Sequence, residues 1–375
     1  MLKNTILTIL CCGLCFLTAC TKGGHSHNSV SDNENKDAKL CIEDSNLNDE
    51  ARFMAGLPIK TNNKRLKAFI RTAQWKAHQE NMNRIWNIYQ QTSPKLMSFA
   101  ENELSDANDD CNFAFYPFSG PDYLFVNALF PKMQTYVLVG LEKVGTPIKV
   151  KKPTADTYQL YENAVSGIFN LSFFSTEDMH SKSGTDTISG VLPIIQMLMA
   201  RTKREIVSVK YKKLNLLGNI QNGDNACNMV EIRFFKQGSH YLQTLYYISC
   251  DLQNRSFAHN LGLQNFIKKN RQQQILCFTK SASYLMHTDS FSFIRSFILD
   301  NSQVIVQDDS GIPWQYFIPD EWDYTLYGSY HNPIDEYTDY KQDDLESAYQ
   351  KADSRILNFR IGYSRQSNLQ IFTRK

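Results

Sequence analysis

Residues 227–250 constrain the fold more than any other segment, because they specify two β-strands and the register between them. The runs CNMVEIRFFKQ and HYLQTLYYISC flank Gly238-Ser239, and apolar runs around a short glycine loop are typical of a β-hairpin. A glycine first in a two-residue loop favours a type II′ turn. Such a turn pairs residues whose numbers sum to 477. It places one apolar set on a single face of the hairpin, as in a half-buried strand pair: Val230, Ile232, Phe234, Leu245 and Tyr247.

The same register sets Cys227 opposite Cys250. In an oxidising compartment this pair is a candidate disulfide. A bulge that shifted the register by one residue would turn the two cysteines to opposite faces instead. The hairpin therefore leaves both outcomes open.

Helical and extended patterns alternate along the rest of the chain. Apolar residues at three- and four-residue spacing predict helix over 61–104, with a second helix starting at Ser93-Pro94. Residues 112–144 have the pattern of a strand, a short helix and a strand, which is a βαβ-like unit. Further helices are expected at 155–174, 188–203, 263–269, 291–299 and 343–352. Further strands are expected at 206–211, 275–284, 304–306 and 357–363.

These patterns predict an α/β or α+β fold, in which one mixed sheet carries helices packed on it beside an N-terminal helical element. We expect the helical element at 51–108 and the mixed α/β body at 109–375. Residues 20–50 are polar and small with few apolar side chains, so they are expected to form a disordered tether.

The first twenty residues have the pattern of an export signal. Lys3 precedes an apolar run that ends at Leu17-Thr18-Ala19-Cys20, which gives a charged region, an apolar region and a small-residue cleavage site. This run is shorter than the roughly twenty residues that a transmembrane helix needs. The sequence Leu-Thr-Ala-Cys resembles the lipobox of bacterial lipoproteins. That resemblance implies a signal peptide at 1–19 and acylation of Cys20, including a palmitate-type chain.

Composition narrows the class of partner. Without residues 1–19 the chain has 39 Lys and Arg against 38 Asp and Glu, since only Lys3 is removed. A nucleic-acid binder would show a strongly basic face, so no nucleic-acid partner is expected. An odd number of cysteines remains after Cys20, namely Cys41, Cys111, Cys227, Cys250 and Cys277. At least one of them is therefore a free thiol or forms an intermolecular bond.

One candidate catalytic site combines two segments of the last third. His287 and Asp289 lie two residues apart at the end of an expected strand, and Asp308, Asp309 and Ser310 follow about twenty residues later. Histidine with carboxylates suits a metal ion, and serine, histidine and aspartate are the components of a catalytic triad. The same residues also suit a helix cap and a plain turn. No motif specifies a metal or another cofactor, so none is assigned.

Residues 314–349 form an aromatic and acidic segment that is a candidate binding surface. Its members include Trp314, Trp322, Tyr324, Tyr327 and Tyr330, interleaved with carboxylates. Such a surface suits a sugar ring or a cationic peptide, whereas the alternative is a long loop held down by its own aromatic side chains. The binding interpretation predicts that Trp322→Ala or Tyr327→Ala abolishes capture without unfolding the chain. A weaker candidate is the turn at 116–122, which offers backbone N–H groups to an anion.

The segments FYPFSGPDYLFVNALFP, SYLMHTDSFSFIRSFIL and QDDSGIPWQYF resemble an uncharacterised group of bacterial envelope lipoproteins over residues 110–365. The resemblance implies a protein of the cell envelope whose function is unknown. We expect the lipid anchor to lie in the outer rather than the inner membrane. Without a strong catalytic motif, we expect a binding or structural module for a glycan, a peptide or a partner protein. The alternative is an envelope hydrolase, which the histidine and aspartate residues would make metal-dependent.

Overall fold

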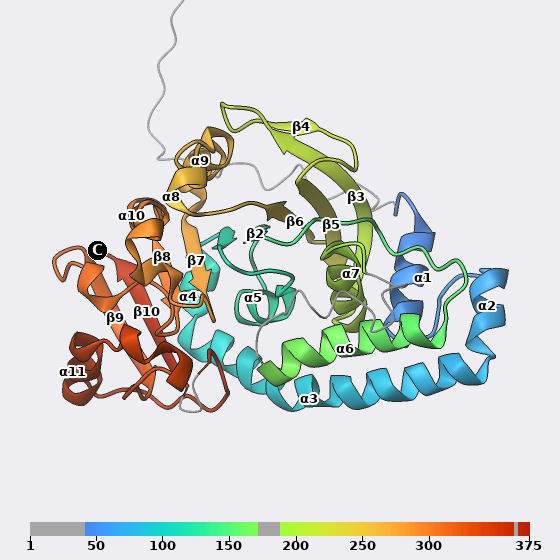
Figure 1. Ribbon diagram of the computed structural model, residues 1–375, viewed down its shortest axis with the longest axis horizontal. Coiled ribbons are helices and arrows are strands. Elements are labelled where there is room, and N and C mark those ends of the chain that lie inside the picture. The colour runs from blue at the N-terminus through green and yellow to red at the C-terminus, as the bar shows by residue number, and fades with distance from the viewer. Residues whose placement is uncertain (1–41, 172–187, 364–366) are drawn as a thin grey trace, which may run out of the picture. The chain divides into compact units, whose positions relative to one another are not determined.

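The computed structural model describes residues 42–171, 188–363 and 367–375. The expected signal peptide, Cys20, Cys41 and most of the expected tether lie outside these residues. The part from Cys41 onward is one compact unit, built on a single ten-stranded mixed sheet with the order β4-β3-β5-β6-β2-β1-β7-β8-β10-β9 (Figure 1). This confirms the predicted fold class. No described helix is long and apolar enough to cross a membrane.

The centre of the sheet is parallel and its two flanks are antiparallel. The parallel strands are β1 (Phe113–Tyr116), β2 (Thr135–Gly140), β6 (Leu242–Ser249), β7 (Ile275–Thr279) and β8 (Val304–Gln307). One antiparallel flank contains β3 (Arg204–Leu214), β4 (Ile220–Asn222) and β5 (Met229–Lys236). The other contains β9 (Trp322–Gly328) and β10 (Asn368–Arg374).

Helices cover both faces of the sheet, as expected where parallel strands are buried on both sides. One face packs against α3 (Ala73–Glu103), α4 (Ser105–Asp110), α5 (Tyr123–Leu129), α6 (Ala155–Leu171) and α7 (Leu192–Arg201). The other packs against α8 (Asn254–Phe257), α9 (Leu261–Lys269) and α10 (Ser292–Asn301). Strand β2 shows the division, because Leu138 belongs to the first core and Val139 to the second. The remaining helices are α1 (Ser45–Met54), α2 (Lys64–Ile70) and α11 (Asp343–Lys351).

The predicted hairpin register is confirmed. Strands β5 and β6 pair Val230 with Tyr247 and Ile232 with Leu245, and the numbers of each pair have the predicted sum. The predicted turn is wrong, because the turn hydrogen bond runs from the Ser239 N–H to the Lys236 carbonyl and Gly238 takes a φ of +84°. The glycine is therefore the second central residue of the turn, not the first.

The candidate disulfide is not formed, and Cys227 and Cys250 are both free thiols. The described ladder ends at Met229 and Ile248. Asn228 and Ser249 are still hydrogen-bonded beyond it. The next residues turn away from each other: Cys250 Sγ lies 3.2 Å from the amide nitrogen of Asn260, and Cys227 lies in the turn after Asp224. The register alone therefore did not bring the two sulfurs together.

Three other expectations differ from the structure. The expected tether is wrong from residue 45, since α1 is folded and buries Asn48, Asp49 and Glu50; their side chains find partners in the fold. Pro94 lies inside the continuous helix α3 instead of starting a new one. The strand expected at 357–363 is absent, and β10 (Asn368–Arg374) pairs with β8 and β9 instead.

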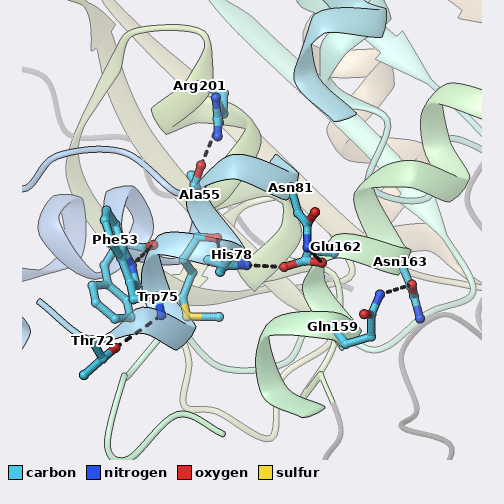
Figure 2. A network of polar contacts seen from close by, with 11 residues as sticks. Phe53, Ala55, Thr72, Trp75, His78, Asn81, Gln159, Glu162, Asn163 and Arg201 are labelled. Atoms are coloured by element: carbon cyan, nitrogen blue, oxygen red, sulfur yellow. Dashed lines mark hydrogen bonds and ion pairs between the residues drawn. The ribbon is translucent and has the colours of Figure 1, made fainter. Parts of the chain in front are cut away.

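A buried polar network joins α1, α3 and α6, and Figure 2 shows it. His78 is 1% exposed; its Nδ1 lies 2.7 Å from the Glu162 carboxylate and its Nε2 lies 2.9 Å from the Met54 carbonyl. Asn81 donates to the second Glu162 oxygen at 3.0 Å. The His78 ring also stacks on Tyr158 at 4.5 Å. These contacts fix the helical layer that covers one face of the sheet.

We expect Glu162→Gln to lower the free energy of unfolding by about 2 kcal/mol, because one of the two groups that contact the buried carboxylate, the His78 ring or the Asn81 amide, loses its acceptor oxygen. Urea denaturation measures this change. Glu80→Gln on the exposed side of α3 is the matched control and should change stability by less than about 0.5 kcal/mol. Equal stability of the two variants would contradict a stabilising role for the network.

Candidate functional site

The order in which the chain adds strands to the sheet changes direction between β1 and β7, although these two strands are parallel. From β1 the chain crosses through α5 to β2 on one side, and β7 lies on the other side of β1 and leads through α10 to β8. Ligands of open α/β sheets bind in the crevice outside the carboxyl ends of the strands at such a reversal. The loops that follow β1 and β7 meet at this place.

A pocket of about 320 Å³ lies at this edge of the sheet. Its wall includes the segments that follow β1, β2, β6 and β7. Apolar side chains line part of it, and Phe118 meets Phe291 there edge to face at 5.8 Å. The polar side chains that line it are Tyr116, Ser119, Asp122, Glu142, Asp251, Gln253, Lys280, Ser281, Ser283 and Tyr363. The size falls at the lower end of the range for small-molecule sites.

A buried ion pair joins the two loops. Lys280 follows β7 directly and its Nζ lies 2.7 Å from Asp122 Oδ2, with 1% and 5% of the two side chains exposed. Tyr116 donates to the same oxygen at 3.0 Å, and burial raises the pKa of Tyr116, so its hydroxyl keeps the proton that it donates. Asp122 Oδ1 accepts the Phe125 N–H at 3.3 Å and thereby caps α5. Lys280 Nζ also lies 3.8 Å from the centre of the Phe125 ring.

The loop after β7 has a strained backbone. Ser281, Ser283 and Tyr284 have φ values of +53°, +52° and +52°, and Phe118 in the facing loop has +59°. The left-handed region costs a residue with a side chain roughly 1–2 kcal/mol. Strain of this kind persists only where neighbouring groups hold the backbone, and it is concentrated at functional sites.

Side chains from β8 and from the segment before β10 hold this loop. The Ser281 N–H donates to Asp308 Oδ2 at 2.9 Å, and the Ala282 N–H donates to Ser310 Oγ at 2.8 Å. The Tyr363 hydroxyl accepts the Ser283 N–H at 3.1 Å and donates to the Ser281 carbonyl at 2.5 Å. Three successive backbone N–H groups of the loop therefore donate hydrogen bonds to side-chain oxygens.

The structure places Asp308, Asp309 and Ser310 under this loop, where they serve as its supports. Ser310 is fully buried, and its hydroxyl donates to Asp308 while it accepts the loop N–H. Asp309 accepts from the Tyr284 hydroxyl and, at 2.8 Å, from the Asn368 amide. Burial and the mutual repulsion of the two carboxylates raise the pKa of Asp308, and burial raises that of Asp309.

The proposed triad is not assembled. His287 Nε2 is buried without a hydrogen-bond partner, so the ring is not bonded to Ser310 or to either carboxylate through that atom. Burial lowers the pKa of His287 to about 4, against the opposing effect of the Asp309 and Gly311 backbone. Asp289 is exposed and does not join the pocket. Among the described residues, no group of three His, Cys, Asp or Glu is placed to hold a metal ion.

The aromatic and acidic segment is not the surface that we expected. Trp322, Tyr327 and Tyr330 are 3%, 1% and 2% exposed, and Trp314 is half-buried. Tyr324 is the exception at 49% exposed. The prediction that truncating Trp322 or Tyr327 spares the fold is therefore wrong, because both side chains belong to the packed core. The alternative, a segment held down by its own aromatic side chains, describes these contacts.

The sequence patterns did not single out two charged residues of the pocket wall, Lys280 and Glu142. Lys280 and Glu142 each follow a strand of apolar residues, ILCFT and TYVLVG, and a charge at the end of a buried strand was the available signal. The turn at 116–122 was identified, but as an anion site formed by backbone groups. The structure shows that its Asp122 carboxylate faces a lysine instead.

No family model matches the chain, and no curated protein or solved structure compared with it matches either. Function is therefore inferred from the geometry of the site.

The pKa shift of His287 predicts a pH-dependent stability. A folded-state pKa of about 4 against about 6.5 in the unfolded chain means that the unfolded chain binds the proton first. This contribution is complete above pH 6.5 and is lost as pH falls toward 4. We expect His287→Gln to remove this contribution. Between pH 6.5 and pH 4 the variant should therefore lose about 2 kcal/mol less free energy of unfolding than the native chain. Urea titration at each pH measures this difference.

Asp308→Asn provides a comparison of opposite sign. A raised carboxyl pKa makes the folded state bind the proton first, so this contribution to stability declines as pH rises from about 4 toward neutrality. Removing it should make the stability of the variant rise more steeply with pH than that of the native chain. Slopes that shift in the same direction in both variants would contradict these assignments.

Proposed function

We propose that this chain is a lipid-anchored envelope protein whose body binds a small polar ligand in the pocket at the carboxyl edge of the sheet. The observation that carries the proposal is the strained loop Ser281–Tyr284, which borders that pocket and is held by three side chains. A fold that maintains such a loop at the reversal of its sheet has a preformed site, which is the usual form of a small-molecule pocket.

The charges of the pocket restrict the ligand. Lys280 and Asp122 neutralise each other, whereas Glu142 and Asp251 add two carboxylates at the ends of β2 and β6. The Asp251 pKa is lowered by its hydrogen bonds from the Gln253 backbone and the Ser256 hydroxyl, so this group is charged at neutral pH. Carboxylates accept hydrogen bonds from hydroxyl and amino groups, and the Phe118 and Phe291 rings offer apolar faces. A neutral or cationic ligand the size of one sugar fits these features.

The hydrogen bonding of the loop serines favours binding over hydrolysis. Ser281 Oγ is buried and has no hydrogen bond in the described structure. A catalytic serine needs a base within hydrogen-bond reach. Ser310 is hydrogen-bonded to Asp308, and no hydrogen bond joins His287 to Ser281 or Ser310 in the described part of the chain, so neither serine is activated there. The pocket is therefore proposed as a receptor site for an envelope saccharide.

Saturation-transfer NMR with glucosamine, N-acetylglucosamine and glucuronic acid tests the site. We expect signals from the first two sugars and a weaker signal from the acidic one, because Glu142 and Asp251 repel it. Glu142→Gln should reduce the difference between glucosamine and glucuronic acid, since it removes one of the two carboxylates that repel the acidic sugar. Asp353→Asn, an exposed position outside the pocket, is the matched control. Equal signals from all three sugars would contradict the proposal.

The anchor is tested separately. We expect metabolically supplied palmitate to label the chain and Cys20→Ser to abolish both the label and recovery in the membrane fraction, because a stable anchor needs the acyl chains. Cys41→Ser is the control and should keep both. Density separation of inner and outer membranes then tests the expected location. A membrane-bound, unlabelled native chain would argue against the lipobox interpretation.

A further inference from the structure

A second pocket, of about 510 Å³, lies at the opposite edge of the sheet and shares no lining residue with the first. Its wall is formed by the C-terminal half of α3, the segment between α5 and β2, and the turn between α7 and β3. Asn108 and Pro131 in this wall precede β1 and β2. The pocket is therefore at the amino ends of strands whose carboxyl ends border the first site.

The charge of this pocket is strongly positive. Among its lining residues one carboxylate, Glu101, faces this set of basic side chains: Lys132, Arg201, Lys203, Arg204 and Lys236. Of these, Lys132 pairs with Asp109 outside the pocket wall. The two arginines have no carboxylate partner in the part of the chain that the structure describes. Their hydrogen bonds go to neutral oxygens of the backbone and of asparagine side chains instead.

Arg204 is the most buried cation of the pocket. It is 9% exposed, and it donates to Asn127 Oδ1 at 2.7 Å and to the Thr202 carbonyl at 3.1 Å. Its Nε has no hydrogen-bond partner. A buried donor without a partner loses its hydration without compensation, so this guanidinium retains the capacity to bind one more acceptor.

Arg201 repeats this pattern beside it. Its Nε donates to the Ala55 carbonyl at 2.7 Å, as Figure 2 shows, and Nη1 donates to Asn83 at 2.9 Å. Its Nη2 is buried without a hydrogen-bond partner and lies beside Gly56, which is not part of the pocket wall. Burial lowers the pKa of this guanidinium to about 10. Two arginines that lack counter-ions carry a desolvation cost, and a bound anion would offset it.

The rest of the wall is apolar and aromatic. Trp86 and Tyr89 are each 8% exposed and lie 4.7 Å apart, and the Arg201 guanidinium lies 5.8 Å from the Trp86 ring. Met97, further along α3, is 50% exposed. A free inorganic anion would use only the basic part of this pocket. An acidic group on an apolar body would use both parts.

We propose that the pocket between α3 and the α7–β3 turn binds an anionic amphiphile, with its acidic group on Arg201 and Arg204 and its apolar body against Trp86 and Tyr89. The exposed Lys203 and Lys236 at the same pocket add long-range attraction for the anion. This site is separate from the pocket proposed for a saccharide, because the two pockets share no lining residue.

Isothermal titration with monomeric dodecyl phosphate, dodecyltrimethylammonium and inorganic phosphate tests the proposal. We expect dodecyl phosphate to bind at least tenfold more tightly than either of the others, because only it matches both the charge and the apolar wall. Comparable binding of the cationic detergent would overturn the anion assignment. Comparable binding of inorganic phosphate would overturn the apolar part.

Variants locate the site. Lys203→Gln with Lys236→Gln changes exposed side chains only and should weaken dodecyl phosphate severalfold, and Arg204→Gln should weaken it at least tenfold. Lys64→Gln at the start of α2, an exposed position outside the pocket, is the control and should leave binding unchanged. If Arg204→Gln fails to fold, the double lysine variant still decides the question. If the double lysine variant bound dodecyl phosphate as tightly as the native chain, the probe would bind outside this pocket and the proposal would be wrong.

Discussion

The buried ion pair between Lys280 and Asp122 is the interaction around which the centre of the sheet is arranged. It joins the end of β7 to the start of α5, so it links the two strands between which the chain reverses direction. Neither side chain is open to water, and a buried pair of this kind is retained only with further hydrogen bonds. Tyr116 and the Phe125 N–H supply these to Asp122. The pair thereby fixes the separation of the loops that form the pocket.

The supports of the strained loop extend this arrangement outward. Asp308 and Ser310 follow β8, and Tyr363 precedes β10, so the loop after β7 is held by elements that are far apart in the sequence. The raised pKa of Asp308 records what burial of that support costs. A fold that needed only a connection from β7 to α10 would gain nothing from a buried carboxylate there. This difference is the reason for proposing that the loop takes part in ligand binding.

Features of the fold that depend on short segments could be predicted from the sequence, whereas features that depend on distant contacts could not. The hairpin register and the fold class depend on side-chain alternation within short segments, and both were predictable. Strands β9 and β10 were missed because Trp322–Gly328 and Asn368–Arg374 pair across the C-terminal third, and strand formation depends on that tertiary context. The roles of Asp308 and Ser310 were missed for a related reason. Their partners are backbone groups of Ser281 and Ala282, and sequence gives no sign that serine there adopts a left-handed conformation.

Net charge illustrates the same limit for function. Beyond residue 19 basic and acidic residues nearly balance, and this balance argues against a polyanion as partner. The fold nevertheless separates the charges that line its two pockets. Carboxylates Glu142 and Asp251 lie at the carboxyl edge of the parallel strands, whereas Arg201 and Arg204 lie at the amino edge. Composition excludes a uniformly basic surface but says nothing about a local excess within a cavity. A ligand the size of a single amphiphile responds to that local excess, because its charged group contacts only a few side chains.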